Sequence, residues 1–189
     1  MTAFALHLLR HGAPETPGLL MGRTDGVPTA EGIAACVAQA EDLGIERLVA
    51  SDLRRSRAAG EAIGRETGVP LAIDPRWSEL DFGDWDGQSS SAVDRDALGH
   101  FWADPDANPP PGGERWSSLV TRVSAAIGDL APVPTLVVTH GGAMRAALNV
   151  LCGLDQRQLW VFDLPYAALL SLRVWPGERL SAQIAGLYP

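Results

Sequence analysis

The sequence predicts an α/β fold, a three-layer sandwich in which a mostly parallel sheet is flanked by helices. Short apolar runs typical of buried strands alternate along the chain with stretches of helical periodicity. Two of these runs, Ala3 to Leu9 and Thr135 to Thr139, lead into a His-Gly pair where a strand turns towards a helix. A hairpin pattern follows near the end of the sequence. The 189 residues contain no internal repeat and no linker, so we expect one domain over 1–189.

Three strands and two helices are predicted in the first part of the chain. Ala3 to Leu9 is apolar almost throughout, as a buried strand is. After a Gly- and Pro-rich loop, Thr29 is a suitable N-cap for a helix that runs to about Leu43 and is ended by Gly44. The Gly- and Pro-rich loop covers Gly12 to Pro28. The further elements are a strand Arg47 to Ala50, a helix Leu53 to about Thr67 closed by Gly68 and Pro70, and a strand Leu71 to Ile73.

In the second part, Trp77 to Gln88 carries too many Gly, Asp and Trp residues for a regular element, which favours an active loop. Ser89 to Ala103 and Glu114 to Leu130 have helical character, and the Pro-Pro-Pro-Gly-Gly stretch within Asp104 to Gly113 indicates a loop or lid. The last predicted elements are a core strand Thr135 to Thr139, a helix Gly142 to Cys152, and a hairpin of Ala167 to Trp175 with Leu180 to Ala185 around Pro176-Gly177.

Composition narrows the possible partners. The formal net charge of −8 argues against nonspecific nucleic-acid or membrane binding, and any anion site must therefore be a local cluster of positive charge. Cys36 and Cys152, the two cysteines, fall inside predicted helices, which favours buried thiols over a disulfide or a metal site. No apolar run approaches the ~20 residues of a membrane span, and the first residues do not resemble a signal peptide. We therefore expect a cytoplasmic location.

Two histidines at strand ends are the most informative side chains. His11 follows Arg10 at the end of the first strand, and His140 follows the strand Thr135 to Thr139. In an open α/β sheet, ligands bind in the crevice at the carboxyl ends of the strands. Two histidines delivered to one crevice, one of them next to an arginine, indicate chemistry on an anion, most simply a phosphate.

Five segments, in order, carry a family resemblance. They are Leu8-Leu9-Arg10-His11-Gly12, Gly22-Arg23-Thr24-Asp25 with Pro28-Thr29-Ala30-Glu31-Gly32, Ser51-Asp52-Leu53-Arg54-Arg55-Ser56, Glu79-Leu80-Asp81-Phe82-Gly83-Asp84-Trp85-Asp86-Gly87, and Val137-Val138-Thr139-His140-Gly141-Gly142. Together they resemble the signature of the histidine phosphatase superfamily, which has the phosphoglycerate-mutase-like fold. The resemblance covers most of the chain, and it implies a phosphomonoester hydrolase that works through a phosphohistidine intermediate.

The resemblance implies a role for each basic residue of these segments. His11 would be the nucleophile, since a neutral imidazole nitrogen can attack phosphorus when the other ring nitrogen is held as a donor. Arg10 and Arg55 would bind the phosphoryl oxygens through their guanidinium groups. The family spacing selects Arg55, and Arg54 is expected to be a surface charge. Arg23 is a further candidate contact for the phosphate or the substrate, with a surface role as the alternative.

The second histidine motif and the acidic segment complete the expected site. His140 would stabilise charge on the transferring group, and Gly141 and Gly142 would let the backbone approach it closely, with Gly141 also a candidate substrate contact. Glu79 would protonate the leaving oxygen and then activate water. Three nearby aspartates, Asp81, Asp84 and Asp86, are alternative acids, and we read them mainly as polar groups of the loop.

No cofactor and no metal are expected, because the sequence has no His-Glu-x-x-His, no Cys cluster and no Walker-type loop. The expected partner is a small phosphorylated substrate, with no nucleic acid and no membrane, and the protein would be a monomer or a homodimer. Trp102, Trp116 and the loop Asp104 to Gly113 are candidates for shaping the leaving-group pocket, although a Trp at a helical position is more often part of the core.

Within the family, two departures favour a phosphatase over a mutase. Mutases carry an Arg-Arg pair after a Trp for the substrate carboxylate, whereas this chain has Phe101-Trp102-Ala103-Asp104-Pro105. Pro17 stands where mutases have an Asn. Gly22 to Asp25, Pro111 to Glu114 and Leu159 to Phe162 are similar to α-ribazole phosphatases of cobalamin biosynthesis, so α-ribazole 5'-phosphate is a candidate substrate. A mutase and a non-catalytic phospho-ligand binder are the alternatives.

Overall fold

The computed structural model describes residues 2–177 and 180–189, which form a six-stranded sheet in the order β3-β2-β4-β1-β5-β6. The strands are β1 (Phe4–Arg10), β2 (Arg47–Ala50), β3 (Leu71–Ile73), β4 (Thr135–Thr139), β5 (Leu169–Trp175) and β6 (Ser181–Tyr188). The strands from β3 to β1 pair in parallel, whereas β5 runs antiparallel to both β1 and β6. β5 alone therefore runs against the others, and the predicted mostly parallel sheet is confirmed.

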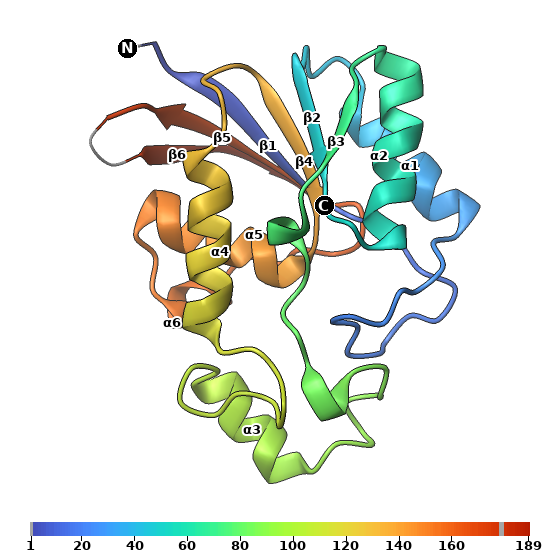
Figure 1. Ribbon diagram of the computed structural model, residues 1–189, viewed down its shortest axis with the longest axis vertical. Helices are drawn as coiled ribbons and strands as arrows, with labels where there is room; N and C mark the ends of the chain where they lie inside the picture. Colours follow the sequence, from blue (N-terminus) through green and yellow to red (C-terminus); the bar gives the residue numbers. More distant parts are fainter. Residues whose placement is uncertain (1, 178–179) are drawn as a thin grey trace.

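Helices cover both faces of the sheet (Figure 1), so the predicted three layers are present. One layer contains α1 (Ala30–Ala40) and α2 (Arg54–Thr67), and the other contains α4 (Trp116–Gly128) and α5 (Gly141–Cys152). Successive residues of a strand point to opposite faces, and β4 is buried on both. Val137 packs in the core with α4 and α5, whereas Leu136 and Val138 pack with α1 and α2.

The helix α3 (Arg95–Ala103) lies in a lobe apart from these layers, at the bottom of Figure 1. The prediction of a helix from Ser89 is wrong over its first turns. Ser89 and Ser91 share a hydroxyl–hydroxyl hydrogen bond of 2.9 Å, and Asp94 caps the helix by accepting from the Ala97 N–H at 2.8 Å. Serine side chains that bond locally compete with helix formation, so the helix begins only after the aspartate cap.

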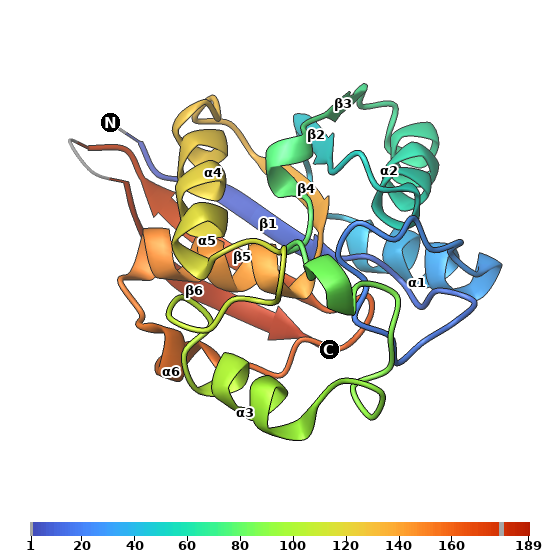
Figure 2. The same ribbon diagram turned by 60° about the horizontal axis from the view of Figure 1, so that its bottom comes forward.

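Three short elements were not expected. They are the 3₁₀ turns η1 (Pro75–Trp77) and η2 (Gly83–Trp85) and the helix α6 (Gln156–Leu159). The α6 helix is held by a capping box between Asp155 and Gln158, and one turn is too short to produce a periodic pattern. In Figures 1 and 2, α6 lies beside α3, and Gln156 Nε2 donates to the Trp102 carbonyl at 3.3 Å.

Several element ends differ from the prediction: α4 is shorter by two residues at each end, and β5 begins at Leu169 and not at Ala167. The helix α1 stops at Ala40, short of Leu43, because Asp42 adopts a φ of 58°, which an α-helix cannot continue. The strand β6 continues past Ala185 to Tyr188, which pairs with Leu169 of β5. Positions 178 and 179 of the predicted hairpin lie outside the described residues. Within the described ranges, none of the helices has the length and apolar character to cross a membrane.

Candidate active site

The sheet topology brings His11 and His140 side by side. β1 and β4 are neighbouring parallel strands with Arg10 opposite Thr139, so the residues that follow the two strands are adjacent. The His11 N–H donates to the Thr139 carbonyl at 2.9 Å, and the centroids of the two imidazole rings are 5.0 Å apart. The two strand-end histidines therefore reach one place, as the strand-end rule predicts.

The contacts of His11 select one tautomer. Its Nδ1 lies 2.8 Å from the Gly12 carbonyl oxygen, which can only accept, so Nδ1 carries the proton. Its Nε2 accepts from Nε of Arg55 at 3.2 Å, and a guanidinium can only donate. Burial, with the positive charges of Arg55 and Arg10 nearby, holds the pKa of His11 well below its usual 6.5. His11 is therefore a neutral imidazole with a lone pair on Nε2.

His140 is completely buried and is positioned by Ser51, whose Oγ lies 2.7 Å from His140 Nε2. Nδ1 of His140 is buried and has no hydrogen-bond partner within 2–177 and 180–189. When the Ser51 hydroxyl donates to Nε2, Nδ1 carries the proton and can donate to a ligand. Burial, and next the charge of Arg55, lowers the pKa of His140 well below 6.5.

Arg10, the last residue of β1, keeps one donor free. Its Nη1 donates to the Leu164 carbonyl, and its Cζ lies 4.3 Å from the centroid of the Tyr166 ring, a cation–π contact. The Tyr166 ring is also 5.5 Å from the His11 ring. The buried Nε of Arg10 has no partner among the described residues. The guanidinium is thus oriented by protein groups while part of it remains available to an anion.

Arg55, near the start of α2, is completely buried and is held by the loop that precedes α1. Besides its contact with His11, it donates to the carbonyl oxygens of Thr24 and Met21 at 2.7 Å and of Gly22 at 3.2 Å. Burial lowers the pKa of Arg55, and the attraction of Glu79 opposes this effect. Nε of Arg55 points at the atom expected to attack phosphorus, so an incoming phosphoryl oxygen would take over that N–H.

Glu79 is positioned by two backbone donors, one at the start of α5 and one from the next residue in the chain. Its Oε2 accepts from the Gly142 N–H at 3.1 Å and its Oε1 from the Leu80 N–H at 2.8 Å. A Cβ at Gly142 would overlap the Glu79 carboxylate, so only glycine leaves room for this contact. Behind it, Arg122 donates to the Glu79 carbonyl at 2.8 Å and forms an ion pair with Glu114 at 2.8 Å.

A cavity of about 210 Å³ opens next to these groups. Its wall includes Arg10, His11, Glu79 and Gly141. Arg55 and His140 are completely buried and are not part of the wall, but both are next to His11, with Arg55 Nε 3.2 Å from His11 Nε2. The rest of the wall is mainly apolar and aromatic. Its side chains come from the loop before α1, from the segment after Glu79, from α3, α4 and α6, and from the loops that follow α3 and α6, namely Leu19, Leu20, Met21, Leu80, Phe82, Phe101, Trp102, Pro105, Trp116, Leu119, Leu159, Trp160 and Tyr166. The cavity is therefore shaped by Trp102, by Trp116 and, from the loop 104–113, by Pro105.

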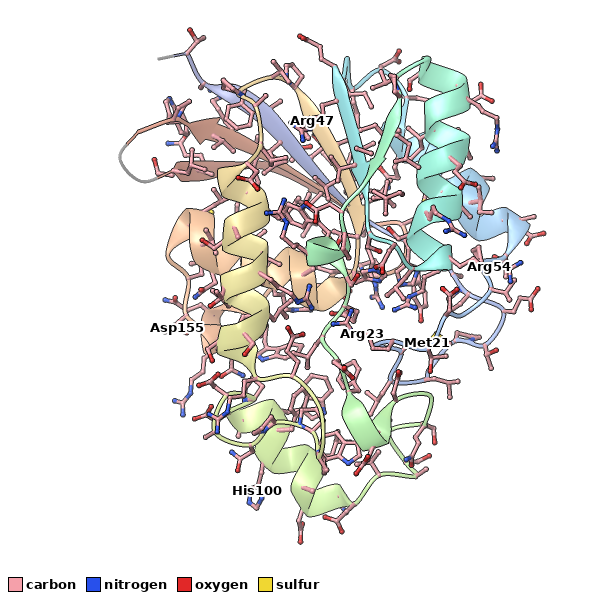
Figure 3. All side chains as sticks on the ribbon, in the orientation of Figure 1. Met21, Arg23, Arg47, Arg54, His100 and Asp155 are labelled. Atoms are coloured by element: carbon pink, nitrogen blue, oxygen red, sulfur yellow. The ribbon has the colours of Figure 1, made fainter. Side chains whose placement is uncertain are left out.

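Other sequence candidates lie outside the cavity wall. Arg23, expected as a possible substrate contact, has a side chain that is 45% exposed and lies 3.6 Å from the Asp81 carboxylate. Asp86 accepts the N–H groups of Gly22, Arg23 and Thr24 at 2.7–2.9 Å, which makes it a loop-holding residue. None of the three aspartates is on the wall, so among the described residues Glu79 is the carboxylate that lines the cavity. Figure 3 shows Arg54 at the start of α2, where its N–H donates to Asp25.

Three residues of the site were missed by the sequence reasoning: Arg145, Tyr166 and Ser51. Arg145 lines the cavity and is the only charged residue of α5, whose other residues are apolar or small except for Asn149. A lone charge in a core-facing helix is a signal that could have been used. Tyr166 lies in an irregular segment and Ser51 follows a short strand, and neither position carries such a signal.

The arrangement can place a phosphoryl group between two neutral imidazoles, two guanidinium groups and one carboxylate. Within the described part of the chain, no group of three or more His, Cys, Asp or Glu side chains is placed to hold a metal ion. The groups next to the reacting centre that can donate hydrogen bonds to a phosphoryl oxygen or carry positive charge are arginine and histidine side chains.

Comparison with known proteins agrees with this geometry. The model of the histidine phosphatase superfamily (branch 1) matches residues 6–184. Glucosyl-3-phosphoglycerate phosphatase of Mycobacterium tuberculosis is 30% identical over 165 residues, which cover 77% of this chain and 74% of the relative. A probable phosphoglycerate mutase, GpmB, of Enterobacter sp. is 31% identical over 163 residues, which cover 79% and 75% of the two chains.

Solved structures share the fold. The native structure of mycobacterial glucosyl-3-phosphoglycerate phosphatase superimposes with a TM-score of 0.86 at 26% identity, covering 97% of each chain. An alpha-ribazole phosphatase from Shigella flexneri superimposes with a TM-score of 0.80 at 21% identity, covering 96% of this chain and 95% of that one. At that identity the second likeness concerns the fold alone.

Proposed function

The chain belongs to the histidine phosphatase superfamily, and on that premise we propose that it is a metal-independent phosphomonoester hydrolase whose phosphohistidine intermediate forms on His11. The observation that carries the proposal is the pair of contacts on His11. Nδ1 is held as a donor to Gly12 at 2.8 Å and Nε2 is unprotonated, with Arg55 Nε 3.2 Å away. A neutral imidazole beside buried cations is prepared to attack a phosphate dianion.

The reaction runs in two balanced steps. Nε2 of His11 attacks phosphorus, the ester P–O bond breaks, and Glu79 gives its proton to the leaving oxygen. Arg10, Arg55 and Nδ1–H of His140 stabilise the charge that spreads over the phosphoryl oxygens. A water molecule then gives its proton to Glu79 and attacks the phosphohistidine, which releases phosphate and restores both side chains. Glu79 is suited to both steps because its carboxylate faces the cavity.

The aromatic wall of the cavity supports a leaving group with an extensive apolar face. Two candidate substrates are suggested by the names of relatives. Glucosyl-3-phosphoglycerate is the substrate named for relatives at 30% identity, and α-ribazole 5'-phosphate, the sequence-based candidate, is named for structures that share the fold at 19–21% identity. The first is the better-supported substrate to test. The cytoplasmic location, the monomer or homodimer and the single domain stay predictions.

A mutase is the second candidate function, because a relative at 31% identity is named a probable phosphoglycerate mutase. A mutase has to keep water from its phosphohistidine and return the phosphoryl group to the substrate. The segment Phe101 to Pro105, which lacks the mutase arginine pair, places Phe101, Trp102 and Pro105 on the cavity wall. Hydrolysis is favoured on that ground. A non-catalytic binder is the third possibility, and turnover alone decides it.

The test is phosphate release from p-nitrophenyl phosphate in excess EDTA by wild type, His11→Ala and His100→Ala. His100 is an exposed histidine on α3, labelled far from the strand ends in Figure 3, and serves as the matched control. We expect wild type and His100→Ala to turn over and His11→Ala to lose at least a thousandfold. Trapping of phosphate on the protein by an alkaline denaturing quench, which preserves the acid-labile P–N bond, should label wild type and His100→Ala but not His11→Ala. Equal turnover by His11→Ala would refute the nucleophile, and interconversion of 3- and 2-phosphoglycerate without net phosphate release would establish the mutase.

A further inference from the structure

Arg145 is a cation in the cavity that the proposed reaction does not use. It lies one helical turn after Gly141 on α5 and shares the cavity wall with Arg10, His11 and Glu79. Its Nη1 donates to the Gly141 carbonyl at 3.3 Å and its Nη2 to the Phe162 carbonyl at 3.1 Å. A guanidinium has five N–H donors. The Nε is buried and has no partner within the described residues, so the hydrogen-bonding capacity of Arg145 is not used up.

No carboxylate in the described part of the chain forms an ion pair with Arg145. Its guanidinium instead covers the Trp160 ring at 4.5 Å from the centroid. Burial lowers the pKa of Arg145, and the attraction of Glu79 and of the exposed Asp163 only partly opposes this. Arg145 is half-buried, and a cation with a buried, unpartnered Nε and no acidic partner is costly, which suggests that an anion completes the site when substrate is bound.

The charges at the site indicate where that anion belongs. A phosphate monoester dianion is balanced by Arg10 and Arg55, and the two histidines are neutral. In the state in which Glu79 carries the proton that it gives to the leaving oxygen, Glu79 is neutral as well, and Arg145 remains as one surplus positive charge. It also borders the same space as Arg10, because a Cβ built on Gly141 would lie 3.2 Å from Arg145 Nη1 and 3.8 Å from Arg10 Nε. The second anion is therefore close to the phosphoryl group, on the leaving-group side.

We propose that Arg145 binds a carboxylate of the leaving group, so that the preferred substrates are phosphomonoesters with a carboxylate within a few bonds of the ester oxygen. The proposal rests on the proposed phosphatase function and names the substrate class of the same site. A planar carboxylate matches the fork of a guanidinium, and the low-polarity wall around Trp160 strengthens the pairing. This single arginine comes from α5, and not from the segment after the acidic motif that supplies the arginine pair in mutases.

The test compares two substrates that differ in one group. In 3-phosphoglycerate a carboxylate stands where glycerol 3-phosphate has a hydroxymethyl group, on the same three-carbon skeleton. We expect wild type to prefer 3-phosphoglycerate in kcat/KM, and Arg145→Met to lower this preference by about 10- to 100-fold, the range for one charge-assisted hydrogen bond. Arg145→Lys should keep part of it. Arg157→Met removes an exposed cation from neighbouring α6 and should keep all of it.

Each outcome is decisive. Equal kcat/KM for the two substrates with wild type, or a preference unchanged in Arg145→Met, overturns the proposal and leaves Arg145 as a support for the Phe162 carbonyl. If Arg145→Met does not fold, Arg145→Gln replaces it. If wild type releases no phosphate from p-nitrophenyl phosphate or from either substrate, the phosphatase function fails. Calorimetric binding of the two compounds to wild type and to Arg145→Met then decides the carboxylate site by the same preference.

Discussion

Gly142→Ala tests whether the position of the Glu79 carboxylate limits the reaction. The new Cβ would overlap Oε1 of Glu79, and ordinary nonbonded contact requires about 3.5 Å, so the carboxylate must retreat by roughly 1 Å. It also loses the hydrogen bond from the residue 142 N–H, which is 3.1 Å long. A displacement of that size costs about 100-fold in rate, or about 2.7 kcal/mol of transition-state stabilisation.

The assay is kcat/KM for glycerol 3-phosphate, whose alkoxide leaving group needs a proton, beside kcat/KM for p-nitrophenyl phosphate, whose leaving group needs it much less. We expect the full loss with the first substrate and a smaller one with the second. Folding should survive, because alanine is the better helix former by up to about 1 kcal/mol.

Gly99→Ala in α3 is the matched control, since a Cβ there meets nothing within 4 Å. It should leave both rates unchanged. Wild-type kcat/KM on glycerol 3-phosphate in Gly142→Ala would refute the assignment of Glu79 as the acid, and so would equal losses on the two substrates.

Three further predictions concern buried groups. Because burial holds the pKa values of His11 and His140 below 6.5, ring-nitrogen NMR should show both neutral at pH 6.5, and a pKa at or above that value for either would contradict the description. As the pH falls, the unfolded histidines bind protons before the folded ones do. The contribution of these two histidines to the free energy of unfolding is therefore complete above pH 6.5 and is lost as the pH falls below it, which urea unfolding at pH 7.5 and 5.5 can measure. Ser51→Ala leaves His140 Nε2 unpaired and should cost about 1–3 kcal/mol in the same assay, whereas no loss would show that the 2.7 Å contact is energetically neutral. Burial raises the pKa of Cys36 to about 12, so the folded protein should not react at Cys36 with a thiol reagent at pH 8, and modification at the rate of the denatured chain would disagree.

The order of the strands and helices was predictable because periodicity is a local property of the chain. The apolar run of β4 is buried on both faces, and a strand of that kind in an alternating α/β order requires helices on both sides of the sheet. The same local rule located His11 and His140 at strand ends. It failed where side chains bond locally, as Ser89 and Ser91 do before α3, because such bonds leave no trace in a hydrophobic pattern.

Local patterns along the chain were therefore enough to predict the fold class, the family resemblance and the residues expected to do the chemistry. The tertiary structure alone decided their partners. Ser51 and His140 are 89 residues apart, and Arg55 meets the carbonyl oxygen of Met21 across 34 residues. It also showed that Arg23 pairs with Asp81 outside the cavity wall and that Arg145 lies on it. The reason is physical: a tautomer, a buried charge or a free donor is a property of the atoms within a few ångströms, and the packing of distant segments determines which atoms those are.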